Sequence, residues 1–191
     1  TAASLEDQYR LYGLTKGQAG PTLGLGEKPK SLPRPNPQGK VNPLLLAFAS
    51  GYTWIARGYA YDVKGLKELI KEGIAHRGLA FLHVLQPCPT YNDLHTKEWF
   101  APRLYRLEEE GYDPLVPPGL PPEALEARMA RFQQKALEWG ERIPVGVFWK
   151  AELPTFEARL KAYLPRYPEA YPARGPETPL DLEGLLQEFA L

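Results

Sequence analysis

Residues 52–86, YTWIARGYAYDVKGLKELIKEGIAHRGLAFLHVLQ, decide the fold. Tyr52–Tyr59 is rich in aromatic and β-branched residues and predicts a strand. Helical spacing then predicts an amphipathic helix over Val63–Ala75, capped by Asp62. Its apolar positions are Leu66, Leu69, Ile70 and Ile74. Leu79–Gln86 is a short apolar run that predicts a second strand.

A further helix is predicted before this stretch. Pro43–Ser50 is apolar, follows the candidate N-cap Asn42 and is ended by Gly51. The order helix, strand, helix, strand is the repeating unit of a parallel α/β sheet, so we predict the α/β class. The functional groups of such sheets lie at the carboxyl ends of the strands, and Cys88 comes just after one such end.

The second half of the chain predicts a long helix, one more strand and a tail. Glu123–Trp139 carries an apolar face with spacings of four, three and four residues: Leu125, Met129, Phe132 and Ala136. Ile143–Trp149 predicts a strand. Two short helical pieces follow within proline-rich chain: Thr155–Tyr163 and Leu180–Phe189.

Proline punctuates the chain, with 21 residues in 191. It is densest in residues 17–43 and 113–122, where we predict exposed connections without helices. A connection as long as the first is uncommon in a domain and is typical of functional or partner-binding surfaces. We predict an α/β domain over residues 1–150 and a C-terminal helical, proline-rich extension over residues 151–191.

Composition excludes several classes of protein. A chain of 191 residues that is 43% hydrophobic can bury an ordinary core, and its zero formal net charge argues against disorder and against nucleic-acid binding. One cysteine excludes a disulfide scaffold. The longest apolar run, Leu44–Ala49, is too short for a membrane span. We expect a soluble, cytoplasmic protein whose few Asn, Met and Cys residues are typical of thermophiles.

Cys88 stands between two prolines in residues 86–92, QPCPTYN. This rigid presentation after a strand suits a metal or cluster ligand. A buried thiol that packs as a small hydrophobe is the alternative, and from the residues alone the commoner one. A cluster needs further thiolates, which this sequence does not hold.

Other side chains form no recognised catalytic or metal-binding pattern. The spacing of His76, His83 and His95 matches no compact zinc site, so we predict that they are exposed or satisfied within the fold. No serine lies in a nucleophile elbow and Cys88 has no evident base, which disfavours hydrolase chemistry. Glu108–Glu110 is predicted to be a solvated charge run.

Residues 12–18, YGLTKGQ, place Thr15 and Lys16 between two glycines. Such a loop can approach an anion closely. It lacks the P-loop pattern, and a flexible turn with a solvated lysine explains the same residues.

The YGLTKGQ segment, continued by Ala19 and Pro21-Thr22, closely resembles a segment of 2-oxoacid:ferredoxin oxidoreductase β subunits. Further segments resemble that family in its own order: NPL at 42–44, ASGY at 49–52, IARG at 55–58, KELI at 67–70, PCPTYN at 87–92 and WGERIPVG at 139–146. The resemblance extends over roughly residues 11–149.

The resemblance implies the latter part of a parallel-sheet thiamine-diphosphate-binding domain. It implies oxidative decarboxylation of a 2-oxoacid (pyruvate or 2-oxoglutarate) to an acyl-CoA, with electrons passed through iron–sulfur centres to ferredoxin. The implied cofactors are thiamine diphosphate, Mg²⁺ and a 4Fe-4S cluster, all requiring residues outside this chain. The implied partners are an α subunit, the remainder of the β subunit, ferredoxin, the 2-oxoacid and CoA, and the chain alone is expected to be inactive.

The resemblance also assigns individual residues. Cys88 matches the last of four cysteine ligands of the cluster, and Leu11 a position whose backbone carbonyl helps to hold Mg²⁺. Leu14 matches a side chain near the 2-oxoacid pocket. Thr15 and Lys16 belong to the loop that closes over the cofactor diphosphate and the substrate. No residue of this chain is assigned a catalytic role.

The sequence departs from the family pattern in two ways. It lacks the CPGCG motif, a further cluster cysteine and the GDGD motif of the family's N-terminal half, and Tyr9 stands where a metal-ligating Asn is usual. The resemblance is therefore to the C-terminal half only. These departures motivate an alternative, a non-catalytic fragment or assembly protein without cofactor binding. A regulatory small-molecule-binding module is a third hypothesis, based on the α/β pattern alone.

Overall fold

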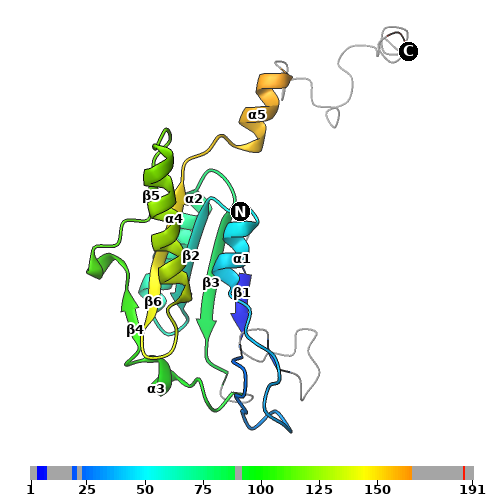
Figure 1. Ribbon diagram of the computed structural model, residues 1–191, viewed down its shortest axis with the longest axis vertical. Coiled ribbons are helices and arrows are strands. Elements are labelled where there is room, and N and C mark those ends of the chain that lie inside the picture. Colours follow the sequence, from blue (N-terminus) through cyan, green and yellow to red (C-terminus); the bar gives the residue numbers. More distant parts are fainter. Residues whose placement is uncertain (1–3, 8–18, 21–22, 89–91, 165–186, 188–191) are drawn as a thin grey trace. The chain divides into compact units, whose positions relative to one another are not determined.

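The computed structural model describes residues 4–7, 19–20, 23–88, 92–164 and 187 (Figure 1). The chain divides into two units, Thr1–Leu153 and Pro154–Leu191. In the second unit, the described residues form helix α5 (Phe156–Tyr163), where Thr155 Oγ1 accepts from Ala158 N. The predicted helix over 180–189 lies outside the described residues, apart from position 187. No helix of the described parts is long and apolar enough to cross a membrane.

A six-stranded sheet forms the centre of the first unit, in the order β1, β3, β2, β6, β4, with β5 also paired to β6. The strands are β1 (Ser4–Asp7), β2 (Trp54–Tyr59), β3 (Ala80–Gln86), β4 (Leu104–Arg106), β5 (Leu115–Val116) and β6 (Ile143–Ala151). The α/β class is confirmed, and β1, β3 and β2 are parallel.

The sheet is mixed, because β6 runs antiparallel to β2 and parallel to β4 and β5. When two successive strands are parallel, a crossover must return the chain from the end of the first strand to the opposite end of the sheet, usually along a helix. The connection from β3 to β4 contains only the four-residue α3 (Lys97–Phe100). β4 therefore begins at the end of the sheet where β3 stops. As a result, β4, β5 and β6 run antiparallel to β1, β2 and β3.

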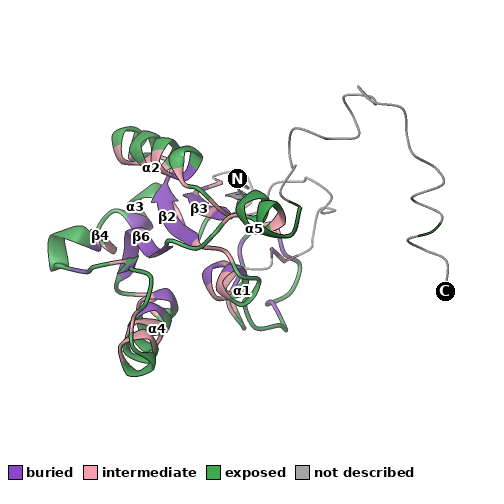
Figure 2. Ribbon diagram, turned by 90° about the horizontal axis from the view of Figure 1, so that it is seen from above, coloured by how far each residue is buried: buried purple, intermediate pink, exposed green. Residues whose placement is uncertain are grey.

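Helices cover both faces of this sheet. Figure 2 shows α2 (Val63–Ala75) on one face and α1 (Pro43–Ala49) with α4 (Pro122–Leu137) on the other. The three helices confirm the predicted segments to within two residues at each end. Glycine at position 58 allows the close approach of α2 to β2, because a Cβ there would lie 2.8 Å from Leu66 Cδ1 and the leucine would have to shift.

The predicted helix caps are also present. Asn42 Oδ1 accepts from Leu44 N and Leu45 N at 3.1 and 3.2 Å, and Asp62 Oδ1 accepts from Gly65 N at 3.0 Å. The apolar face of α4 packs on the sheet through fully buried Phe132, beside Phe48 and Trp149. A second core lies beneath α2 and includes Trp54, Leu82 and Val84.

Within the long proline-rich connection, the described residues 23–43 form no helix before α1, as predicted, but part of them is buried. Asn36 is 3% exposed and its Nδ2 donates to Leu23 O, Gly24 O and Gln38 O at 2.9, 3.1 and 2.9 Å. Leu23 and Leu32 pack together. We call residues 23–38 the arm. The second connection is not wholly irregular either, since it contains β5.

Candidate functional site

The carboxyl ends of β1, β3 and β2 lie together at one edge of the sheet, which we call the carboxyl edge (Figure 1). Tyr59 ends β2 and is in register with Leu85 of β3, and Ala60 N continues the pairing by donating to Leu85 O at 2.9 Å. Cys88 follows two residues after the end of β3. Ligands of α/β proteins bind outside such strand ends.

Cys88 is a half-buried, free thiol. Its carbonyl accepts from Asn92 N at 2.8 Å, and Asn92 Oδ1 in turn accepts from Leu94 N and His95 N at 3.0 and 3.1 Å. Asn92 itself is fully buried. The buried Asn92 side chain therefore holds residues 92–95, and the Asn92 backbone is bonded to that of Cys88.

The arm is attached to this edge by a pair between the half-buried Glu27 and the buried His95. His95 Nε2 and Glu27 Oε1 are 3.0 Å apart, and Lys30 N donates to Asp93 Oδ1 at 2.7 Å. The hydrogen bond to His95 is the main cause that lowers the pKa of Glu27, which burial opposes. Gly24 N adds a second hydrogen bond, to Glu27 Oε2 at 2.6 Å. An ionised Glu27 is thus built into the contact between arm and edge.

Aromatic side chains line the carboxyl edge. The Tyr59 ring lies 5.6 Å from both Tyr61 and Phe100, and Phe100 is 4.9 Å from Trp99. Trp139 approaches Trp99 at 6.2 Å. Tyr59 is 8% exposed, and its Oη is buried without a hydrogen-bond partner in the described parts of the chain. The edge thus combines an apolar wall with one unsatisfied donor.

A buried cation, Arg57, and an exposed one, Lys40, lie beside Trp139. Arg57 is 2% exposed, and its Nε donates to His83 Nδ1 at 3.1 Å. Its guanidinium lies over the Phe148 and Trp139 rings, 5.3 and 5.7 Å from their centroids. Lys40 covers Trp139 at 4.6 Å, and burial followed by the charge of Arg57 lowers its pKa. A small cavity of about 120 Å³ lies among these residues.

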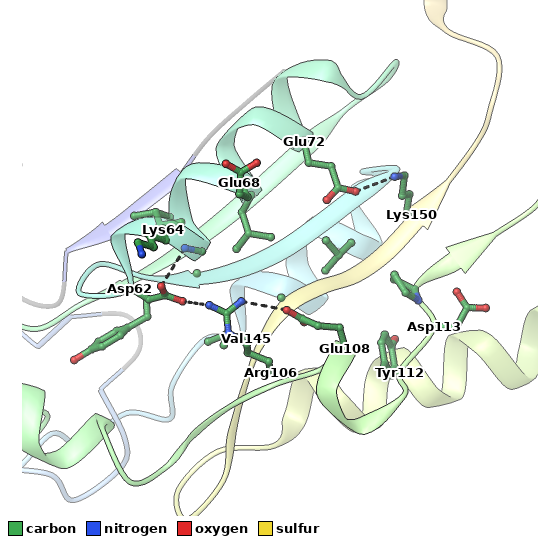
Figure 3. A pocket seen from close by; sticks show the side chains of 18 of the residues that line it. Asp62, Lys64, Glu68, Glu72, Arg106, Glu108, Tyr112, Asp113, Val145 and Lys150 are labelled. Atoms are coloured by element: carbon green, nitrogen blue, oxygen red, sulfur yellow. Dashed lines mark hydrogen bonds and ion pairs between the residues drawn. The ribbon is translucent and has the colours of Figure 1, made fainter.

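A larger cleft, of about 650 Å³, lies on the α2 side of the sheet between α2, β6 and residues 106–115 (Figure 3). Five of its charged side chains pair with one another: Arg106 with Asp62 and Glu108, and Lys150 Nζ with Glu72 Oε1 at 2.8 Å. Gly146 of β6 forms part of its lining with φ of 118°, and a Cβ there would lie 2.8 Å from Glu108 Oε2. We call this pocket the α2 cleft.

Some of the site residues predicted from the sequence lie within the described part of the structure, and others lie outside it. Cys88 lies at the carboxyl edge, whereas Tyr9, Leu11, Leu14, Thr15 and Lys16 fall outside the described residues. The histidines are satisfied, as predicted, and His76 Nε2 is 2.8 Å from Thr53 Oγ1. In the parts of the chain that are described, no three His, Cys, Asp or Glu side chains gather to hold a metal ion.

The Glu108–Glu110 run is exposed, as predicted. It forms a 3₁₀ turn, η1, whose carboxylates also pair with Arg106, Lys135 and Arg142. Sequence reasoning missed Tyr59 and Arg57. Both lie within a predicted strand. The alternation of apolar and polar residues along a strand indicates which side chains are buried, but it does not show whether a buried polar atom has a hydrogen-bond partner.

Comparisons with known proteins agree with the motifs. A family model for the C-terminal part of the pyruvate ferredoxin oxidoreductase beta subunit matches residues 88–164, beginning at Cys88. The 2-oxoacid:ferredoxin oxidoreductase subunit beta of a Sulfolobus species is 57% identical over 166 residues, which are 86% of this chain and 53% of that protein. The protein of the same name from Saccharolobus solfataricus is 50% identical over 187 residues, or 93% and 60% of the two chains.

This chain is homologous to part of these β subunits. The resemblance inferred from the motifs is therefore confirmed, with the chain spanning just over half the length of these relatives. A solved 2-oxoglutarate:ferredoxin oxidoreductase from Magnetococcus marinus, with 2-oxoglutarate, coenzyme A and succinyl-CoA bound, has the same fold at a TM-score of 0.66 and 26% identity. The match covers 94% of this chain and 55% of that one.

Proposed function

We propose that the chain is part of the β subunit of a 2-oxoacid:ferredoxin oxidoreductase. This enzyme would oxidatively decarboxylate a 2-oxoacid such as pyruvate or 2-oxoglutarate to an acyl-CoA and pass the electrons to ferredoxin. The observation that carries the proposal is the 57% identity over 166 residues to a β subunit of that name. The ligands named for the Magnetococcus structure support a 2-oxoacid and CoA as substrates.

The working enzyme would contain an α subunit and the remainder of the β subunit as well as this chain. By the family resemblance, the motifs missing from these 191 residues would come from that remainder. We therefore expect the chain to be inactive alone. A free thiol and an iron–sulfur centre both suit the reducing cytoplasm, which is where we expect the enzyme to work.

Cys88 would be one ligand of a 4Fe-4S cluster. The residues around it fit such a group: the thiol is free and half-buried at the carboxyl edge, and a buried donor without a partner, Tyr59 Oη, lies at the end of the neighbouring strand. The aromatic wall around Phe100 would limit the access of water, and access of water is one control of a cluster's potential. The other ligands would come from outside this chain.

Leu11, Thr15 and Lys16 would take part in holding thiamine diphosphate and Mg²⁺, and Leu14 would lie beside the 2-oxoacid. Thiamine diphosphate would supply the stabilisation of the carbanion that forms on decarboxylation. The ammonium of Lys16 would offset the negative charge of the diphosphate or the substrate carboxylate. Glu27 and His95 would hold the arm against the edge and so limit the access of water.

Purified, assembled enzyme should reduce ferredoxin or a viologen dye only when both a 2-oxoacid and CoA are present. Parallel assays with pyruvate, 2-oxoglutarate and a branched 2-oxoacid would identify the preferred substrate. An assembled complex that holds its cofactors but shows no reduction with any of these would contradict the proposal. It would favour a non-catalytic assembly role for this chain.

A further inference from the structure

Three buried side-chain atoms in the described parts of the chain lack a hydrogen-bond partner: Ser31 Oγ, Tyr59 Oη and Arg103 Nε. Ser31 is only half-buried, and the guanidinium of Arg103 bonds through another nitrogen to Trp99 O at 2.8 Å. Tyr59 differs from both, because its only polar side-chain atom is the unsatisfied one and the residue is 8% exposed. A buried phenol of this kind is costly unless an acceptor reaches it.

Tyr59 and Cys88 come at the ends of neighbouring strands of the sheet. Tyr59 is the last residue of β2 and pairs in register with Leu85, three residues before Cys88 on the neighbouring strand. The side chains of Tyr59, Leu85 and Phe100 belong to one buried cluster. The unsatisfied donor and the free thiol therefore belong to adjacent strand ends.

The surroundings of Tyr59 indicate which kind of acceptor fits. Its ring contacts are Tyr61 and Phe100, and the charge that acts on it is the carboxylate of Glu98. Burial is the main cause that raises the pKa of Tyr59, followed by Tyr61 and Glu98, so the phenol remains a proton donor at neutral pH. Phosphate and carboxylate ligands are normally held by several cations and N–H donors. A single donor in an aromatic wall suits a cluster sulfur instead.

We propose that the Tyr59 hydroxyl donates a hydrogen bond to a sulfur atom of the iron–sulfur cluster that Cys88 would ligate. This inference rests on the proposed function and adds a residue that tunes the cluster. The hydrogen bond withdraws electron density from the sulfur and stabilises the reduced cluster. Tyr59 is thus a tuning residue that raises the reduction potential, and it is not a ligand.

The test uses the assembled enzyme with its cofactors, in which Tyr59→Phe removes only the hydroxyl. Titration of the reduced-cluster EPR signal should show a shift to more negative potential relative to wild type. Pulsed EPR after exchange into D₂O should show that an exchangeable proton coupled to the cluster in wild type is lost in the variant. Tyr61→Phe is the matched control, because Tyr61 is 52% exposed. It should change neither observation.

Incorporation of a difluorotyrosine at position 59 keeps the ring and makes the hydroxyl a stronger donor. It should shift the potential in the positive direction and retain the coupled proton. An unchanged potential and coupling in Tyr59→Phe would overturn the inference. A higher KM for the 2-oxoacid with an unchanged potential would also overturn it, because the acceptor would then be the substrate. A lower Tm with an unchanged potential would overturn it as well, because the acceptor would then be another protein group.

Failure of this inference is distinguishable from failure of the proposed function. If wild-type enzyme holds no cluster, or if Cys88→Ser retains the wild-type cluster, the proposed ligand is wrong. If wild-type enzyme holds a cluster that depends on Cys88 while Tyr59→Phe changes neither potential nor coupling, only the role of Tyr59 is wrong.

Discussion

The α2 cleft and the carboxyl edge each contain a buried tyrosine, and the two hydroxyls differ in their partners. At the cleft, Tyr112 Oη donates to Phe148 O at 2.7 Å. At the edge, Tyr59 Oη has no partner among the described residues. The carboxylates of the cleft are likewise paired, as Asp62 and Glu108 with Arg106 illustrate (Figure 3).

This difference shows that the size of a cavity is a poor guide to function in this fold. The cleft is the larger hollow, but its carboxylates and the Tyr112 hydroxyl already have partners within the chain. The carboxyl edge has a free thiol and an unsatisfied donor beside buried aromatic rings. It is the region that requires an additional group, so the two regions should respond differently to substitution.

The largest expected effect is on packing at the carboxyl edge. Phe100→Ala should lower the free energy of unfolding by about 3–5 kcal/mol, because the ring is fully buried among Tyr59, Trp99 and Trp139. Leu115→Ala at the cleft is the control and should cost less than about 1 kcal/mol, because Leu115 is 39% exposed. Urea unfolding of the chain measures both, and equal losses would contradict the comparison.

The next effect is the pH dependence that Tyr112 contributes. Burial raises its pKa to about 12 from an ordinary value near 10. The folded state therefore keeps a proton that the unfolded state loses, so the stabilisation is complete below pH 10 and decreases as pH rises towards 12. The loss should be about 2–3 kcal/mol over this window. Tyr112→Phe should flatten the decrease in urea-unfolding measurements, and an unchanged slope would contradict the assignment.

A smaller effect compares the two hydroxyls directly at neutral pH. Tyr112→Phe should destabilise the chain by about 1–2 kcal/mol, because a buried hydrogen bond is lost. Tyr59→Phe should leave the stability of this chain unchanged or raise it, because it removes an unsatisfied buried group. Thermal unfolding of the two variants beside wild type tests the difference. A larger loss for Tyr59→Phe would indicate an acceptor within the chain itself.

The smallest effect concerns the paired charges of the α2 cleft. Arg106→Gln should cost less than about 1 kcal/mol, because Arg106 and Asp62 are both 38% exposed and water already screens their attraction. The difference from wild type should shrink further in 1 M salt. A loss of several kcal/mol at either ionic strength would show that the cleft depends on these charges more than the structure implies.

Much of the fold was predictable because local patterns determine it. The helix over Val63–Ala75 and the caps Asn42 and Asp62 follow from apolar spacing and short polar side chains. The direction of β6 did not follow, because it depends on where the connection after β3 re-enters the sheet. The short strands Leu104–Arg106 and Leu115–Val116 carry no periodicity and exist through pairing with β6.

The candidate site was predictable only where a residue carries its chemistry in its own identity. Cys88 is the single cysteine and follows a strand, so position and residue type were enough to mark it. Tyr59 looks like any strand aromatic, and its significance comes from the absence of a partner in three dimensions. The Glu27–His95 pair joins positions 68 residues apart, which no local pattern indicates.

The most direct test of the carboxyl edge as a cluster site is the iron content and EPR spectrum of the assembled enzyme carrying Cys88→Ser. The account predicts loss of one 4Fe-4S signal, a matching loss of iron per β subunit, and loss of 2-oxoacid-dependent ferredoxin reduction in a complex that still assembles. Full iron content with an unchanged spectrum and activity would contradict it.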